Sequence, residues 1–278
     1  MQKVDFSAIY DAPAVTLRGY VPEGTGKSSL LVLPGGGYQL CAYPEGEPVA
    51  AHFAEMGYAA FTLEYSVCGE VNPRAVFPGP LREVALAVKH LRDHAGELGI
   101  DPERIYLFGA SAGGHLAAAY GSCWRDAALF CDIADAETLR PDALVLLYCA
   151  SELDDYSMML PSICGHAAPF TQEEIDRWII KNRLGADFPP AVLFHSAPDP
   201  MVPVQQSLNL FAALQEKEIP SELHVFGGGE HAYGLGTGTP AEVWPALADR
   251  FLREMHDAPE NFSREAMRLA RLRRKGLL

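Results

Sequence analysis

Ser111 stands in the stretch Gly109-Ala-Ser-Ala-Gly113, with one glycine two residues before it and another two residues after it. An apolar run at residues 105–108 precedes this stretch, and small residues that favour a helix follow it. The pattern predicts a tight turn from a strand into a helix, because a side chain at either glycine would collide as the two elements close together. The Ser111 hydroxyl would then be exposed beside the N–H groups that begin the helix, where it can attack a carbonyl group. Five common residues are a weak signal alone, so the rest of the chain has to supply the partners.

A serine hydroxyl is a poor nucleophile near neutral pH, so it needs a histidine to take its proton and a carboxylate to orient that histidine. Of nine histidines, His195 and His231 alone stand at the ends of late predicted strands, where ligands bind in open parallel sheets. His195 lies within an apolar run, so we expect it to be a core or supporting residue. His231 lies in a glycine-rich loop and is the better base. Asp199 follows a strand end, which predicts a place beside His231, and the order Ser111, Asp199, His231 is that of the α/β-hydrolase fold.

Three glycines, Gly35 to Gly37, follow an apolar run at residues 30–33. Glycine allows backbone conformations that turn several N–H groups in one direction, and a developing oxyanion needs such donors. We therefore expect the N–H groups of Gly36 or Gly37, together with that of Ala112 after the serine, to form an oxyanion hole. A merely flexible loop is the alternative.

Helical and strand patterns alternate along the chain, which indicates parallel strands joined by crossover helices. The sequence therefore predicts one domain over residues 1–278, with a mostly parallel central sheet flanked by helices on both faces. Residues 22–27 are rich in turn-forming amino acids and predict a hairpin-like connection between the first two strands. The predicted strands are 15–20, 29–33, 58–65, 105 onward, 143–149, 191–196 and 222–226, and the predicted helices are 45–56, 81–91 and 204–217.

Residues 150–188 interrupt this alternation after a strand end, where they can form a lid or part of a substrate pocket. A capping box, Thr171-Gln-Glu-Glu174, predicts a helix that continues to about residue 184. The apolar residues of the insert, Tyr156 among them, predict that some of it lines the pocket, although a subunit interface is an equal alternative. We expect Met158, Met159 and Tyr38 to contact substrate.

The C-terminal residues 259–278 predict a helix, amphipathic over residues 263–275, with several arginines. A solvated face is the more common role of such a basic stripe, and an acidic partner or nucleic acid is the alternative.

The chain has 278 residues, of which 49% are hydrophobic, and a net charge of -14. This charge argues against nucleic acids and anionic membranes as partners. Six cysteines without a C-x-x-C pair predict buried free thiols in a reducing compartment. The N-terminus lacks an apolar targeting segment, so we expect a cytoplasmic protein, and a homo-oligomer is possible. The sequence implies no metal and no organic cofactor.

Five pieces of the sequence, together with His231, resemble the α/β-hydrolase esterases of the acetylxylan esterase and xylan-associated carbohydrate esterase group. The pieces are residues 33–38, 45–49, 109–116, 199–207 and 222–226, and they extend over nearly the whole chain. The resemblance implies a serine esterase that removes small acyl groups from sugars through an acyl-enzyme. It assigns the catalytic roles to Ser111, Asp199 and His231.

Two positions depart from patterns that related esterases often show. Pro34 stands where many carboxylesterases have a histidine before the glycines, and Ala232 stands where glycine often follows the catalytic histidine. The resemblance also includes His115, which we expect to be structural. Lipase-like, peptidase or amidase activity uses the same three residues, and a catalytically silent binding protein remains the alternative outside enzymes.

Overall fold

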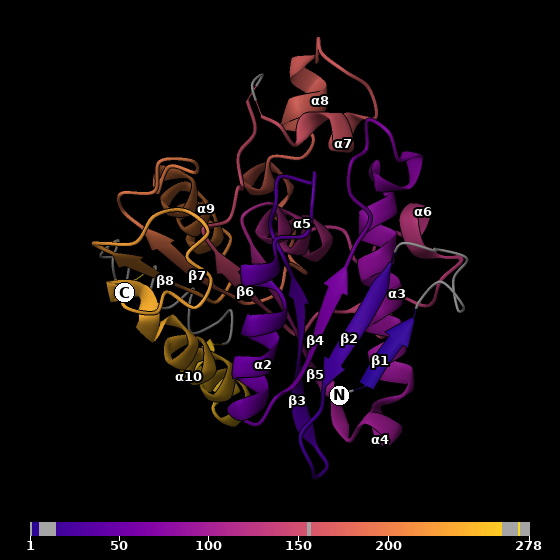
Figure 1. Cartoon of the computed structure of the whole chain (residues 1–278), viewed down its shortest axis with the longest axis vertical. Coiled ribbons are helices and arrows are strands. Elements are labelled where there is room, and N and C mark those ends of the chain that lie inside the picture. The colour runs from indigo at the N-terminus through magenta and orange to yellow at the C-terminus, as the bar shows by residue number, and fades with distance from the viewer. Residues whose placement is uncertain (1, 6–14, 155–156, 263–271, 273–278) are drawn as a thin grey trace.

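A single sheet of eight strands runs through the described part of the chain, which is residues 2–5, 15–154, 157–262 and 272 of a computed structural model (Figure 1). The strand order is β1-β2-β4-β3-β5-β6-β7-β8. Strands β3 to β8 run parallel, and β1 and β2 are the antiparallel edge. This arrangement is the predicted α/β-hydrolase architecture. The strands are β1 Gln2–Asp5, β2 Thr16–Tyr20, β3 Lys27–Leu33, β4 Ala59–Glu64, β5 Ile100–Ala110, β6 Ala143–Leu147, β7 Ala191–Ser196 and β8 Ser221–Phe226.

The sequence predicted a hairpin between residues 15–20 and 29–33, which form β2 and β3, and this prediction is wrong. Strand β2 pairs with β4, and β4 separates it from β3. The burial of the strands explains the difference, because β2 buries only alternate residues whereas Leu30–Leu33 of β3 are buried on both faces. A strand covered on both faces belongs inside a parallel sheet, and a half-covered strand belongs near its edge.

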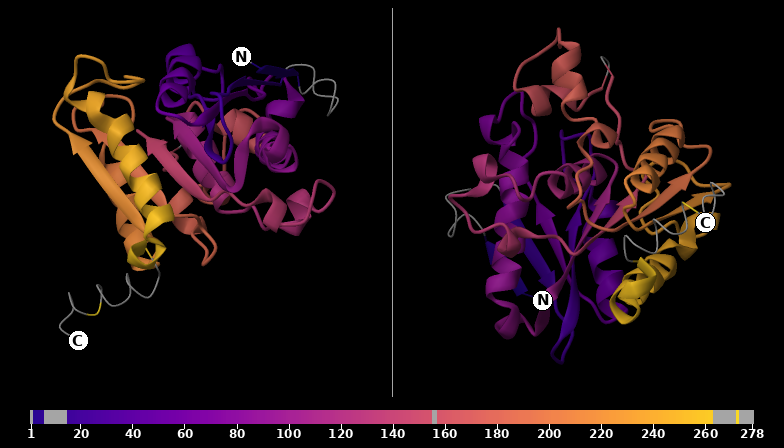
Figure 2. Two further views of the ribbon diagram at one scale, coloured as in Figure 1. Left: turned by 90° about the horizontal axis from the view of Figure 1, so that it is seen from below. Right: turned by 180° about the vertical axis from the view of Figure 1, so that it is seen from behind.

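Helices cover both faces of the sheet, as Figures 1 and 2 show. Leu30 and Val32 point to the face covered by α2 and α10, while Leu31 and Leu33 point to the face covered by α3, α5 and α9. Helix α10, with buried Trp244, was not predicted and covers the sheet beside α2. The longer helices are α2 Glu47–Glu55, α3 Gly79–Asp93, α5 Ala112–Gly121, α9 Gln205–Glu216 and α10 Trp244–Asp257.

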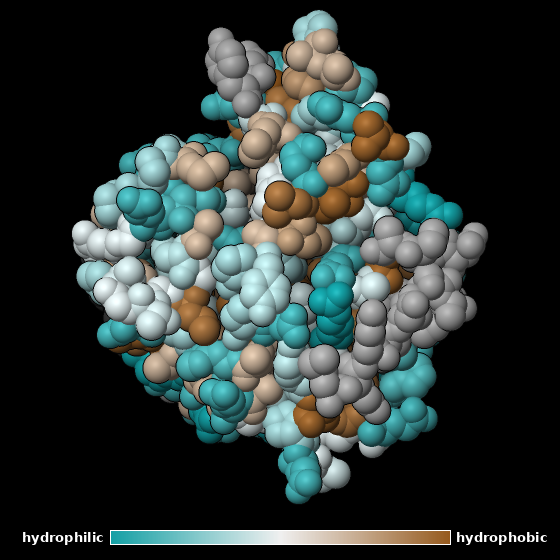
Figure 3. Space-filling view, in the orientation of Figure 1, coloured by the Kyte–Doolittle hydropathy of each residue, from teal (hydrophilic) through white to brown (hydrophobic). Residues whose placement is uncertain are grey.

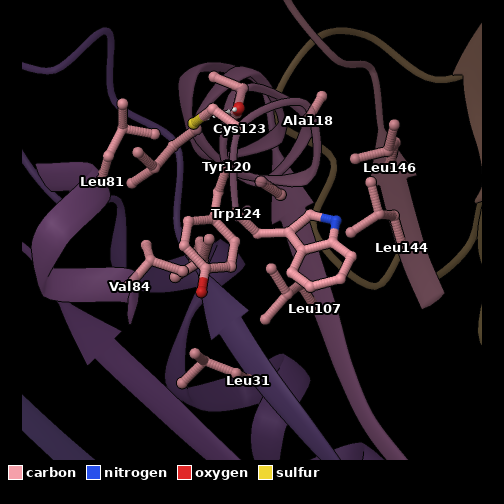
Figure 4. Packing of buried hydrophobic residues seen from close by; sticks show 14 of the residues in the cluster. Leu31, Leu81, Val84, Leu107, Ala118, Tyr120, Cys123, Trp124, Leu144 and Leu146 are labelled. Atoms are coloured by element: carbon pink, nitrogen blue, oxygen red, sulfur yellow. Dashed lines mark hydrogen bonds between the residues drawn. The ribbon is translucent and has the colours of Figure 1, made fainter. Parts of the chain in front are cut away.

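Every residue of α5 is buried, and its small side chains let the helix lie close to β5 and β6. A side chain at Gly114 would come within 3.1 Å of Cys149. Figure 4 shows the larger residues at this contact, where Tyr120 and Trp124 pack against leucines of the sheet. The tight packing of α5 fixes the position of its first residue, which follows Ser111.

The segment after β6 lies above the carboxyl ends of the strands, where Figure 1 shows α7 and α8. The capping box of Thr171 and Glu174 is present, but α8 ends at Asp176, so the predicted helix to residue 184 is wrong. After Asp176 the chain turns inward, and Trp178 packs edge-on against Phe77 with ring centres 4.9 Å apart. The α-helix is not continued, because the N–H groups of Trp178 and Ile179 donate to carbonyls three residues back and that of Ile180 donates to Ser151 O. The short helices are α4 Ala95–Leu98, α6 Ala127–Phe130, α7 Leu160–Cys164 and α8 Gln172–Asp176.

Apart from residue 272, the C-terminal helix predicted over residues 263–275 lies outside the described residues, as does Tyr156 of the insert.

Candidate active site

Ser111 occupies the sharp turn between β5 and α5. Its backbone has φ of 52° and ψ of −118°, a conformation that non-glycine residues rarely adopt. A Cβ atom at Gly109 would lie 2.3 Å from Gly113 O, and one at Gly113 would lie 2.1 Å from Leu33 O. Both glycines are therefore required by the close approach of strand and helix, as the sequence predicted. The Ser111 side chain emerges partly exposed at the carboxyl end of β5.

The structure brings Ser111, His231 and Asp199 into one chain of hydrogen bonds. His231 Nε2 lies 2.9 Å from Ser111 Oγ, and His231 Nδ1 lies 2.7 Å from Asp199 Oδ2. Since a carboxylate only accepts, Nδ1 carries the proton, and Nε2 accepts the proton of the serine hydroxyl. The loop that carries His231 is tied to β7, because Ser196 Oγ donates to Gly229 O.

Asp199 is held in its ionised form. The backbone N–H groups of Met201 and Val202 each donate to Asp199 Oδ1 at 2.9 Å. Burial by itself raises the pKa of Asp199, but the hydrogen bonds from the two histidines and the two backbone groups outweigh it and bring the pKa below its usual range. A carboxylate that stays ionised keeps His231 in one tautomer and favours the imidazolium when it forms.

His195 also faces Asp199, yet it is engaged elsewhere. Its Nε2 lies 2.8 Å from Val202 O and 3.4 Å from Asp199 Oδ2, so the carbonyl is the main acceptor and the carboxylate a weak second one. Its Nδ1 lies 2.7 Å from Ser207 Oγ. His195 is fully buried, as the sequence predicted.

In the glycine loop after β3, one N–H group has an acceptor in the protein and the next two have none among the described residues. Gly36 and Gly37 have φ of 118° and 63°, which glycine adopts without strain. The N–H of Gly35 donates to Glu45 Oε2 at 2.8 Å. Among the described residues no acceptor is found for the N–H groups of Gly36, Gly37 and Ala112. These three are therefore available to bind an anionic oxygen near Ser111.

The three residues predicted to contact substrate lie in different environments. The Tyr38 side chain is fully buried and its hydroxyl lies 2.9 Å from His115 Nδ1, so that prediction is wrong for the side chain. Met159 is only 4% exposed and belongs to the core, so that prediction is wrong as well. Met158 is 57% exposed, and its sulfur lies 2.6 Å from where a Cβ of Gly37 would be. Met158 is therefore the one of the three whose side chain is exposed beside the glycine loop.

His115 is structural, as expected. It is fully buried, and burial lowers its pKa to about 4, so the ring is neutral. Its Nε2 lies 2.9 Å from Trp178 O and donates to this carbonyl, while Nδ1 accepts from the Tyr38 hydroxyl. His115 thus joins α5, the glycine loop and the insert at residues 150–188.

The base of the insert is tied to the body at further points. Ser162 Oγ accepts the Gly69 N–H at 3.1 Å, Ser162 O accepts the Phe77 N–H at 3.0 Å, and the Glu152 N–H donates to Gln206 Oε1 at 3.0 Å. These bonds hold the insert in place over the strand ends. Figure 3 shows hydrophobic residues gathered on this face just below α7 and α8. The exposed large hydrophobic residues of the described chain include Leu40, Tyr43 and Met158.

The cysteines only partly follow the expectation of buried thiols. All six are free, and Cys123 and Cys149 are buried, but Cys131 is exposed because it lies on a surface turn after α6. Within the described residues there is no cluster of three potential metal ligands. No described helix is both long and apolar enough to cross a membrane.

Sequence reasoning missed two residues at this site, Glu45 and Tyr148. Glu45 is 1% exposed, accepts the Gly35 N–H, and accepts the Tyr148 hydroxyl at 2.7 Å. The Tyr148 ring lies 4.9 Å from the His231 ring. The only signal in the sequence is that Glu45 lies ten residues after Gly35, in a piece that resembles related esterases, and no periodicity marks its carboxyl group as buried.

Comparisons with known proteins identify a family and several relatives of this chain. The model of the BD-FAE family matches residues 20–214. Endo-1,4-beta-xylanase B of Butyrivibrio fibrisolvens is 30% identical over 74% of this chain, and acetylxylan esterase of Xylanibacter ruminicola is 22% identical over 85% of it. The chain spans only 32% and 46% of the lengths of these two relatives. The crystal structure of an acetyl ester-xyloside bifunctional hydrolase from Caldicellulosiruptor lactoaceticus is 30% identical, with a TM-score of 0.76 over 87% of this chain and 88% of that chain.

Proposed function

Because the chain belongs to the BD-FAE family and folds as an α/β hydrolase, we propose that it is a serine carboxylic-ester hydrolase. Ser111 is the nucleophile, His231 is the general base, and Asp199 orients the histidine. The observation that carries this proposal is the continuous contact from Ser111 Oγ to His231 Nε2 and from His231 Nδ1 to Asp199 Oδ2, at 2.9 and 2.7 Å. The two distances lie within the range that proton transfer requires.

In the first half of the reaction, Ser111 Oγ attacks the ester carbonyl carbon while its proton passes to His231 Nε2. The carbonyl oxygen becomes an oxyanion and accepts the N–H groups of Gly36 or Gly37 and of Ala112. The tetrahedral intermediate then collapses. The bond to the alcohol oxygen breaks, the alcohol takes the proton from His231, and the acyl group remains on Ser111.

In the second half, a water molecule attacks the acyl carbon and gives one proton to His231 Nε2. The second tetrahedral intermediate uses the same N–H donors. Its collapse returns the proton from His231 to Ser111 Oγ and releases the carboxylic acid. No step in this sequence calls for a metal or an organic cofactor.

The substrate that we propose is a small ester, such as an acetyl group on a sugar or xylo-oligosaccharide. The names of the similar xylanase, acetylxylan esterase and acetyl ester-xyloside hydrolase support this choice. The chain's net charge of -14 fits a neutral carbohydrate better than an anionic ligand. A cytoplasmic location and a homo-oligomer both stay predictions.

A fluorophosphonate probe tests the proposal, because it reacts with an activated serine and forms a covalent adduct. We expect labelling of the wild-type protein, no labelling of Ser111→Ala, and normal labelling of Ser207→Ala, which removes a buried hydroxyl. Hydrolysis of acetyl, feruloyl and octanoyl esters of one alcohol would then rank the acyl groups. An unlabelled wild-type protein that hydrolyses none of these esters would exclude the proposed function and favour a silent binding protein.

A further inference from the structure

Glu45 is a buried carboxyl group that contacts both sides of the candidate site without touching the triad. It ends the 3-10 helix Tyr43–Glu45, with Gly46 between it and α2, and its side chain reaches under the glycine loop. Its Oε2 accepts the Gly35 N–H at 2.8 Å, and its Oε1 accepts the Tyr148 hydroxyl at 2.7 Å. The Tyr148 oxygen in turn accepts the Gly234 N–H at 3.2 Å. One carboxyl group therefore links the glycine loop to the loop that carries His231.

The bond to Gly35 restricts the residues that follow it. A Cβ atom at Gly35 would lie 2.4 Å from Glu45 Oε2 and 2.9 Å from the Ser111 Cβ, so the loop is enclosed between the carboxyl group and the serine. With the Gly35 N–H committed to Glu45, the next N–H groups, of Gly36 and Gly37, are left for the oxyanion. A donor contributes to the transition state only if it is held in position before the reaction begins.

The link to the histidine loop runs through Tyr148. Its ring is fully buried and lies 4.9 Å from the His231 ring at 59°, and 4.6 Å from the Tyr233 ring. Tyr148 itself has φ of 34°, which is uncommon for a non-glycine residue and places its ring under the loop. The hydroxyl of Tyr148 donates to Glu45 and accepts from Gly234, so both of its roles are filled.

The pattern of donors requires Glu45 to act as an acceptor on both oxygens, which suits the carboxylate form. Burial raises the pKa of Glu45, while the hydrogen bonds from Tyr148 and Gly35 and the charge of His231 oppose that rise. By the same attraction, a carboxylate at this place favours a positive charge on His231, which is the charge that develops as the histidine takes the serine proton.

We propose that Glu45 is a positioning residue for the hydrolysis, which aligns the oxyanion donors through Gly35 and the catalytic base through Tyr148. This inference rests on the proposed esterase function. Glu45 touches neither the reacting atoms nor the substrate, so its effect belongs to the transition state and not to substrate binding. Replacing a buried residue with a purely structural role would change the stability of the protein without lowering kcat more than it changes KM.

The test replaces the carboxylate with an amide in Glu45→Gln. An amide accepts on one atom only, so either Gly35 or Tyr148 loses its acceptor. We expect kcat for a neutral acetyl ester to fall about 10- to 100-fold, while KM changes less than about threefold. Inhibition by a boronic acid, which forms a tetrahedral adduct with an activated serine, should weaken by the same factor as kcat/KM.

The matched control is Glu83→Gln. Glu83 is a second buried glutamate, and it accepts the Ser66 N–H at 2.7 Å and the Ser66 hydroxyl at 2.6 Å, away from the triad. We expect its kcat to stay within about twofold of the wild-type value. Tyr148→Phe removes only the hydroxyl and should lower kcat by roughly 3- to 10-fold. If Glu45→Gln does not fold, the kcat of Tyr148→Phe still tests whether the hydrogen bond between Tyr148 and Glu45 supports the reaction.

The outcomes separate this inference from the function on which it rests. A wild-type protein that neither reacts with fluorophosphonate nor hydrolyses esters overturns both. An active wild-type protein overturns this inference alone if kcat of Glu45→Gln stays within about twofold, or if KM accounts for the loss. Equal losses of kcat in Glu45→Gln and Glu83→Gln would likewise reduce Glu45 to a structural residue.

Discussion

Two pairs of serine and histidine face the same carboxylate in this protein. In the surface pair, Ser111 Oγ lies 2.9 Å from His231 Nε2, and in the buried pair Ser207 Oγ lies 2.7 Å from His195 Nδ1. Asp199 contacts both histidines. In each pair the serine hydroxyl donates to an unprotonated ring nitrogen, so the hydrogen bond alone does not distinguish a nucleophile from a core residue.

The surroundings of the two serines differ. Ser207 is 1% exposed inside α9, and His195 donates to Val202 O as its main acceptor. Ser111 stands partly exposed on a strained turn, and His231 donates to a charged carboxylate. Beside the surface pair, the N–H groups of Gly36, Gly37 and Ala112 have no acceptor among the described residues and can bind an oxyanion. Access and oxyanion donors, and not the serine–histidine contact, give a serine the setting of a nucleophile.

Ser111→Ala tests this comparison most strongly. We expect kcat to fall by about 10⁴- to 10⁶-fold, because no nucleophile remains on the pathway. The hydroxyl contributes little to packing, so the free energy of unfolding should change by less than about 0.5 kcal/mol. Steady-state kinetics and thermal unfolding measure the two effects. Near-normal turnover by the folded variant would mean that another residue is the nucleophile.

Asp199→Asn affects both pairs at once. We expect kcat to fall by about 10²- to 10⁴-fold, because the amide no longer fixes the tautomer of His231. Hydrogen bonds hold the pKa of Asp199 below its unfolded value, so its ionised form stabilises the protein above about pH 4, and this contribution is lost as the pH falls further. The difference in Tm between wild type and variant should therefore be largest near neutral pH and shrink in acid. A difference that grows in acid would contradict this sign.

Ser207→Ala examines the buried pair alone. We expect kcat and KM to stay within about threefold of wild type, since Ser207 is closed to substrate. The variant leaves His195 Nδ1 without a donor in the core, and such a loss costs about 1 to 3 kcal/mol of unfolding free energy. Denaturant unfolding measures the cost. A large loss of activity at unchanged stability would show that the buried pair takes part in the reaction.

Met158→Ala addresses a neighbour that the surface pair has and the buried pair lacks. Met158 lies against Gly37 and is exposed, so its truncation should open space beside the glycine loop. We expect the ratio of kcat/KM for octanoyl to acetyl esters to rise by a few-fold, which corresponds to about 1 kcal/mol. Met159→Ala is the matched control. Met159 is in the core, so its truncation should destabilise the protein by about 2 to 5 kcal/mol and leave the ratio unchanged. An unchanged ratio in Met158→Ala would remove this residue from the acyl pocket.

The sequence by itself determined the features that depend on neighbours along the chain. The turn at Ser111 follows from two glycines two residues away on either side, and the alternation of strands and helices follows from apolar periodicity. In a parallel sheet every strand ends at the same edge. Residues that follow strand ends, such as Asp199 and His231, therefore meet there, and the sequence predicted that they would lie beside Ser111.

Only the tertiary structure decided the features that depend on contacts between distant parts of the chain. Tyr38 follows the glycine loop directly, but its ring turns inward because His115, on another element, accepts its hydroxyl. Glu45 and Tyr148 are 103 residues apart, and nothing in either segment indicates that they meet. The direction of a side chain and the partners of a buried polar group depend on which segments pack together. The local sequence does not indicate which distant segments these are.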